Sequence, residues 1–105
     1  MRITISHKQS KERAIQMVDQ AIEDAFTGLA LGPIQIVNQQ KSWSGSVMQF
    51  SLTAKMGFLK NPVAGTVEVT DRDVTIDADL GMLNRFIPED KVRTTVEMKV
   101  RGLLT

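Results

Sequence analysis

The chain has 105 residues, 42% of them hydrophobic, and its 13 basic and 12 acidic side chains nearly balance. This length predicts one domain, residues 1–105, with one small core. We expect no nucleic acid partner, since no more than two basic residues are adjacent and aromatic residues are few. The absence of cysteine excludes disulfides, a thiol nucleophile and cysteine-based metal sites.

The first third of the chain predicts a strand and then a helix. Residues Met1–Ser6 alternate between apolar and polar side chains, as in a strand with one buried face. A helix should follow from about Ser10, which can cap it, and Gly28 is a plausible end. Its apolar stripe has three- and four-residue spacing and comprises Ile15, Val18, Ile22, Ala25, Phe26 and Leu29. Acidic residues near the end of this helix, Asp19, Glu23 and Asp24, oppose its dipole.

Four more strands and a second helix follow. We predict strands at residues 33–38, 42–54, 64–70 and 74–80, with the last two paired as a hairpin. In the second of these, a bulge near Gly45 would return Trp43 and Val47 to the core side. The final helix should begin near Pro88, with an inward stripe of Val92, Val96, Val100 and Leu103.

The order of the predicted elements is β-α-β-β-β-β-α, which indicates an α+β fold. Nearly every strand has one apolar and one polar face, and each helix has one apolar stripe. The economical packing is a mainly antiparallel sheet of about five strands with both helices on its apolar face. The opposite face would be wet or would meet a partner.

The chain shows no targeting or spanning segment. The start of the chain lacks the charged stub and apolar run of a secretory signal. No apolar stretch approaches the roughly 20 residues of a membrane-spanning helix. We therefore expect no transmembrane segment and a cytoplasmic location.

Residues suited to catalysis or metal binding are few. The single histidine, His7, lies in a loop without a nucleophile motif, and we expect a solvent-facing or capping role. The densest acidic set is Asp71, Asp73, Asp77 and Asp79, which lacks EF-hand spacing and is better explained as a turn and a solvated strand face. We therefore predict no catalytic residues, no metal site and no cofactor, and we expect that the protein is not an enzyme.

Two connectors between predicted elements are unusually apolar. They span residues 55–60 and 80–87, and basic residues flank the apolar ones. Connectors normally run over the surface and are polar. The candidate contact residues are Met56, Phe58, Leu59, Met82, Leu83 and Phe86. They could contact a lipid-like ligand, a polymer surface or another subunit, or they could close the ends of a small core.

The stretch from Trp43 to Leu83 resembles a known family. The pattern consists of Trp43, Phe50, Gly65-Thr66-Val67-Glu68-Val69, Val74-Thr75-Ile76-Asp77-Ala78-Asp79-Leu80 and a Gly-Met-Leu turn before an amphipathic helix. It resembles the polyhydroxyalkanoic acid system proteins, small bacterial proteins associated with polyester granules. The resemblance implies a role in polyhydroxyalkanoate storage, at the granule surface or in polymer synthesis and use, and it supplies no catalytic residues.

Three functions are consistent with these observations. The first is a non-enzymatic accessory protein that contacts the apolar granule surface or a protein partner. The second is a carrier of a small hydrophobic ligand, held between a curved sheet and the last helix as in helix-grip folds. The third, least favoured, is an enzyme. A symmetric homodimer is expected, because an open sheet face and edge invite pairing.

Overall fold

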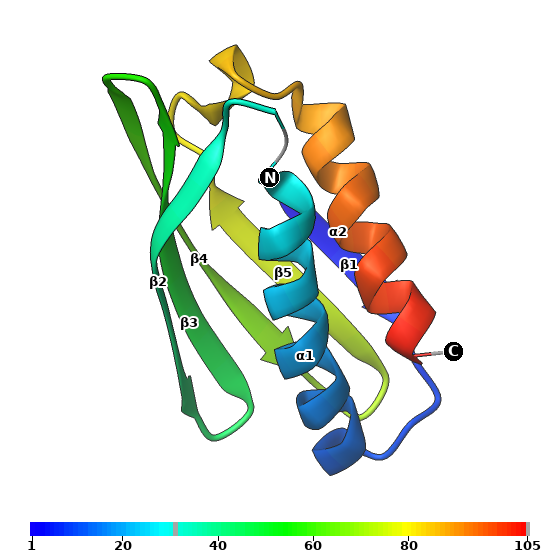
Figure 1. Ribbon diagram of the computed structural model, residues 1–105. Coiled ribbons are helices and arrows are strands. Elements are labelled where there is room, and N and C mark those ends of the chain that lie inside the picture. Colours follow the sequence, from blue (N-terminus) through cyan, green and yellow to red (C-terminus); the bar gives the residue numbers. More distant parts are fainter. Residues whose placement is uncertain (31, 105) are drawn as a thin grey trace.

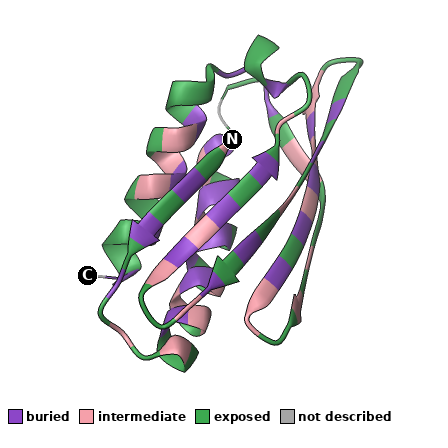
Figure 2. Ribbon diagram, turned by 180° about the vertical axis from the view of Figure 1, so that it is seen from behind, coloured by how far each residue is buried: buried purple, intermediate pink, exposed green. Residues whose placement is uncertain are grey.

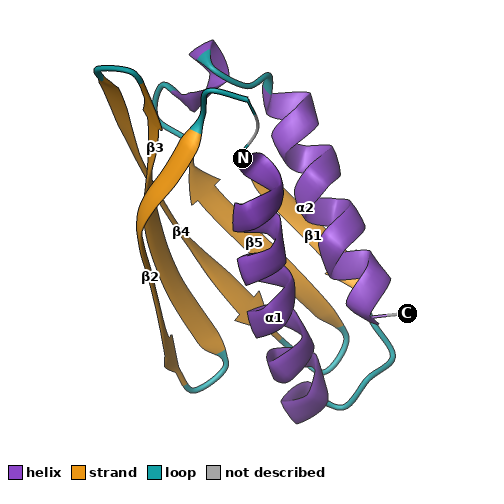
Figure 3. Ribbon diagram, in the orientation of Figure 1, coloured by secondary structure: helices purple, strands orange, loops and turns teal. Residues whose placement is uncertain are grey.

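Five strands form one antiparallel sheet in the computed structural model, which describes residues 1–30 and 32–104. The elements are β1 (Arg2–Ser6), α1 (Lys11–Leu29), β2 (Gln35–Ser44), β3 (Val47–Met56), β4 (Leu59–Val69), β5 (Asp73–Asp79), the short 3₁₀-helix η1 (Leu83–Arg85) and α2 (Glu89–Leu104). The strand order is β1-β5-β4-β3-β2, and both helices cover one face of the sheet (Figures 1 and 3). The predicted α+β class and element order are confirmed.

Helix α1 begins as predicted and continues past its predicted end. The Ser10 hydroxyl accepts a hydrogen bond from the Arg13 N–H at 3.2 Å, which caps the first turn. Gly28 lies inside the last turn and does not end the helix. A Cβ atom added there would lie 3.3 Å from the Cγ2 of Thr95 on α2. Gly28 therefore allows the two helices to approach each other closely.

Strands β2 and β3 form a hairpin where one bulged strand was expected. Gly45 lies in the two-residue turn, with a φ of +61°, because the chain reverses there. The bulge lies earlier, between Val37 and Gln40. Trp43 pairs with Met48 on the core side, as predicted. Val47 adjoins Met48 in the same strand and therefore lies on the opposite face, so its predicted placement was wrong.

Strand β4 begins five residues earlier than the sequence predicted. Pro62 lies within it and pairs with Thr53 of β3. A proline normally disrupts a central strand, because it has no N–H to donate. Here β5 pairs with β4 only from Ala64 onward, so no strand pairs with Pro62 on its other side. The first residues of β4 and the end of β3 therefore extend beyond β5 as a two-stranded projection.

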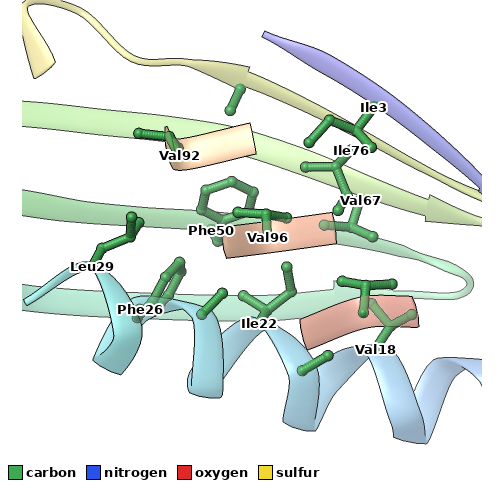
Figure 4. Close-up of a cluster of buried hydrophobic side chains, with 14 of the residues drawn as sticks. Ile3, Val18, Ile22, Phe26, Leu29, Phe50, Val67, Ile76, Val92 and Val96 are labelled. Carbon is green, nitrogen blue, oxygen red and sulfur yellow. The ribbon is translucent and has the colours of Figure 1, made fainter. Parts of the chain in front are cut away.

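The core lies between the helices and the sheet. Buried and exposed residues alternate along the strands, as Figure 2 shows from behind the sheet. The Phe26 ring of α1 packs against Phe50 of β3, with centroids 5.7 Å apart (Figure 4). On α2 the last buried position is Leu104, whereas the predicted Leu103 is partly exposed. The core stripe of α2 is otherwise as predicted.

Replacement of Gly65 by alanine tests how closely β3, β4 and β5 approach one another at this position. A Cβ atom at Gly65 would lie 2.4 Å from the Asp77 carbonyl oxygen and 2.7 Å from Cζ of Phe50. We therefore expect Gly65→Ala to lower the free energy of unfolding by about 1–3 kcal/mol, measured by urea denaturation. Gly102→Ala is the matched control, since nothing lies within 4 Å of a Cβ there. In helix α2 it should stabilise by up to about 1 kcal/mol. Equal effects of the two changes would contradict the close approach at Gly65.

Candidate functional site

Phe58, the most exposed large apolar residue of the described part of the chain, belongs to the turn between β3 and β4. We call residues 55–60 the hairpin tip. Met56 and Leu59 are cross-strand partners, and Gly57 has a φ of +60° at the first turn position, the geometry of a tight II′ hairpin. Phe58 occupies the second turn position and is fully exposed, and Leu59 is 56% exposed. The hairpin tip therefore presents apolar side chains to solvent from a regular two-stranded support.

The six predicted contact residues divide into three groups. Phe58, Leu59 and Met82 are exposed, the last to 49%. Met56 and Phe86 are half-buried and pack against the core. Leu83 is 2% exposed, so it belongs to the core, and its side chain is not available for contact. The first connector is thus largely a surface feature, whereas the second mainly closes the core and leaves Met82 outside.

A buried asparagine, which the sequence analysis missed, joins the two connectors. The Asn61 side-chain amide donates to the Leu80 carbonyl at 2.9 Å, and its Oδ1 accepts from the Met82 N–H at 2.7 Å. The residue is 4% exposed. The only sequence signal was the dipeptide Asn61-Pro62, which commonly marks a turn. In the structure, Asn61 holds the second connector against the base of the hairpin tip, at the same end of the molecule (Figure 1).

A charged cluster fastens α1 to β2 on the helix side of the sheet. The Lys41 ammonium lies 2.9 Å from Oδ1 of Asp19 and 2.6 Å from Oε1 of Glu23. The Trp43 indole N–H also donates to Asp19, at 2.9 Å. Two acidic residues that oppose the helix dipole are therefore compensated by partners from the sheet. The sequence could not show this, because the partners lie about twenty residues apart.

The cluster shifts two pKa values. Burial would raise the pKa of Asp19, but hydrogen bonds from Trp43 and Lys41 and the Lys41 charge outweigh it, so the net pKa is lowered. Burial would lower the pKa of Lys41, but hydrogen bonds with Glu23 and Asp19 and their charges outweigh it, so the net pKa is raised. Both shifts favour the charged forms in the folded protein, as expected for structural ion pairs.

His7 has a structural position and not the solvent-facing one that we considered. It is buried, and its Nδ1 accepts a hydrogen bond from the Gln9 N–H at 3.1 Å. Its Nε2 lies 2.8 Å from the Thr70 carbonyl oxygen, so Nε2 carries the proton and donates. Both ring nitrogens are thus engaged with backbone groups, and the imidazole ties the end of β1 to the β4–β5 turn.

The four aspartates do not converge. No group of three or more potential metal ligands occurs among the described residues. Asp73 accepts from the Thr70 hydroxyl at 3.0 Å, and Asp79 accepts from the Gly81 N–H at 2.9 Å, so both stabilise turns. Asp77 lies on the outer face of the sheet, within a wide, open depression of about 640 Å³. Its other polar lining residues are mainly amides and hydroxyls from β2, β3 and β4, such as Gln49, Ser51 and Thr66.

The apolar space that the described residues leave between the helices and the sheet is small. The space between the helices and the sheet has a volume of about 30 Å³ and is lined by apolar side chains. The helix-grip carrier needs a cavity of several hundred Å³ for a drug-sized ligand. Core side chains fill that place here, which argues against the carrier hypothesis.

The fold and its surface define a two-layer α+β protein with an exposed apolar hairpin tip. A family model described as "Putative polyhydroxyalkanoic acid system protein" matches residues 1–104. The chain therefore belongs to this family, which confirms the resemblance noted in its sequence. Neither the search of curated proteins nor the search of solved structures found a match. No helix in the described part of the chain combines the length and apolarity needed to cross a membrane.

The Asp19 cluster predicts a pH dependence of stability. Because the pKa of Asp19 is lowered from 3.8 on folding, its contribution is complete above that value and is lost as the pH falls through the folded pKa. Asp19→Asn should lower the free energy of unfolding at neutral pH by a few tenths to about 1 kcal/mol, since the pair is partly exposed. The difference from wild type should shrink in acid. A difference that stays constant down to the lowest pH at which the protein folds would contradict this account.

Asn61 should matter for stability although it lies next to an exposed surface. Asn61→Ala leaves the Met82 N–H and the Leu80 carbonyl without their side-chain partner. We expect urea denaturation to show a loss of about 1–3 kcal/mol. Asn84→Ala is the matched control, because Asn84 is exposed in η1, and its effect should stay within about 0.5 kcal/mol. Equal losses of unfolding free energy in both variants would show that the loss does not come from the Asn61 hydrogen bonds.

Proposed function

We propose that this protein is a non-enzymatic accessory protein of the polyhydroxyalkanoate storage system, and that its hairpin tip contacts the apolar surface of the polyester granule. The observation that carries the proposal is the full exposure of Phe58 at the apex of a regular hairpin. Membership of the family supports the link to the storage system, and the exposed apolar side chains support the contact with the granule. The proposed location is the cytoplasm, at the granule surface.

The need for a core does not explain the hairpin tip. Phe58 and Leu59 are exposed to water although the neighbouring Ala54 and Val63 are buried. Transferring a phenylalanine or leucine side chain out of water stabilises by about 1.5–3 kcal/mol. An apolar surface that covers the hairpin tip would provide this free energy for Phe58 and part of it for the half-exposed Leu59.

The proposed absence of catalysis rests on the surroundings of the ionisable groups. A general base needs a free nitrogen or oxygen within reach of a substrate. Both ring nitrogens of His7 are engaged with backbone groups, and Asp73 and Asp79 stabilise turns. Asp77 lies in an open depression. Its other ionisable lining residues among those described are Asp79, which stabilises a turn, and Lys41, which pairs with Asp19 and Glu23. These features support a binding role.

The expected homodimer stays a prediction. Strand β2 is one edge of the sheet, and a second copy could pair with it. Two features oppose edge-to-edge pairing: the bulge between Val37 and Gln40, and the charged side chain of Lys41, which turns toward α1. The other edge, β1, is partly covered, because Arg93 of α2 donates to the Arg2 carbonyl at 3.0 Å.

Co-sedimentation with polyester granules tests the contact. Phe58→Asp should weaken binding by at least about tenfold, because a carboxylate replaces the apolar side chain at the apex. Its free energy of unfolding should change by less than about 0.5 kcal/mol, since the residue is fully exposed. Met98→Asp is the matched control, because Met98 is 68% exposed on α2, and this variant should bind like wild type.

Two results would contradict the proposal. Equal binding by Phe58→Asp and wild type would show that the hairpin tip is not the contact. Binding to native granules but not to granules stripped of their proteins by protease would indicate a protein partner in place of the polymer surface.

A further inference from the structure

The hairpin tip carries two lysines in an unusual arrangement. Lys55 and Lys60 are direct cross-strand partners, so both side chains leave the same face of the hairpin, the face away from the helices. Like charges at directly opposed positions destabilise a sheet. Neither lysine forms an ion pair with a described residue. The free protein therefore holds two uncompensated positive charges next to Phe58.

The chain provides no negative charge near these lysines in sequence. Residues 25–67 contain no aspartate or glutamate, although they include β2, β3 and most of β4. The third lysine of this stretch, Lys41, is neutralised by Asp19 and Glu23 of α1. Lys55 and Lys60 thus differ from Lys41 in having no acidic partner, which leaves their charge available to an external anion.

Other charges at this end of the molecule do not cancel the lysines. Arg85 in η1 is a further exposed cation at the same end (Figure 1). The acidic residues there include Glu89 and Asp90, which lie in the first turn of α2 and complement the positive end of its dipole. Glu89 also lies 3.9 Å from the terminal ammonium of Met1. Among residues 1–30 and 32–104, no ion pair joins Lys55 or Lys60 to an acidic side chain.

We propose that the hairpin tip binds anionic phospholipid headgroups, with Phe58 and Leu59 entering the apolar layer and Lys55 and Lys60 contacting the phosphates. This inference rests on the proposed function and specifies the surface that the same site meets. Apolar side chains flanked by lysines are the composition of segments that lie in a lipid interface. Leu59 pairs with Met56 and leaves the face opposite to the lysines, so the lysines border Phe58 at the apex from one side, with their ammonium groups at the headgroup level.

Vesicle binding tests the inference. The full chain is sedimented with vesicles of phosphatidylcholine alone and with vesicles that also contain phosphatidylglycerol, at low and high NaCl. The variants are Lys55→Gln/Lys60→Gln, Phe58→Asp and a matched double change at the opposite end of the molecule, Lys8→Gln/Lys11→Gln. Native granules are sedimented in parallel, so that the granule contact is measured independently of the vesicles.

We expect wild type to prefer the anionic vesicles and to lose this preference at high salt. Lys55→Gln/Lys60→Gln should weaken binding to them by about 25-fold, since each lysine near an anionic surface contributes about fivefold. The distal double variant should bind like wild type, and Phe58→Asp should bind weakly to both vesicle types. The fold of the tip variant should be intact, because the change removes a like-charge pair.

Three results would overturn the inference. Wild type that binds granules but shows no preference for anionic vesicles would leave the proposed function standing and remove the headgroup contact. Equal binding losses in the two double variants would assign the effect to net charge and not to the hairpin tip. Wild type that binds neither granules nor vesicles would overturn both proposals.

Discussion

The fold depends on the close approach of three strands at Gly65. A side chain there would overlap the Asp77 carbonyl of β5, and the Phe50 ring of β3 occupies the space that a side chain would need. The same ring packs against Phe26 of α1, so this contact also joins the sheet to a helix. The missing side chain thus lets β4 bind β3 and β5 closely on both sides while an aromatic ring closes the core.

The projection of the hairpin tip follows from the unequal lengths of β4 and β5. Since β5 ends opposite Ala64, the earlier part of β4 pairs with β3 alone among the strands, and Pro62 is tolerated there. Two residues, Met56 and Asn61, support this projection. Met56 packs against the core, and Asn61 holds the chain that follows β5. The rest of the protein therefore acts as a scaffold that presents Phe58 from a firmly anchored base.

The local pattern of apolar and polar residues was sufficient to predict the order of helices and strands. It did not show contacts between segments that are distant in the sequence. The alternation in residues 74–80 and the helical stripes identified their elements, because each pattern repeats over several turns or pairs. The turn glycine Gly45 was interpreted as a bulge, because one residue cannot distinguish a kink from a reversal. Pro62 made the start of β4 resemble a loop, since nothing in the sequence shows where β5 ends.

The candidate site was predicted only in part, for a related reason. The apolar composition of the two connectors was evident from the sequence, but whether each covers the core or faces solvent depends on tertiary packing. Leu83 is buried and Phe58 is fully exposed, although both are large apolar residues in glycine-containing connectors. The partners of Asn61 and Lys41 are set by packing between distant segments. Sequence spacing carries no information about such pairs.

The small size of the hairpin tip limits the kind of contact that it can make. Covering Phe58 provides about 1.5–3 kcal/mol and covering the half-exposed Leu59 about half as much, and binding must also offset the loss of translational and rotational freedom. Charge attraction to an anionic layer adds to this sum, and such attraction weakens with salt. A contact of this strength is reversible. Stable attachment would need several copies on one surface, because linked weak contacts gain affinity through their effective concentration.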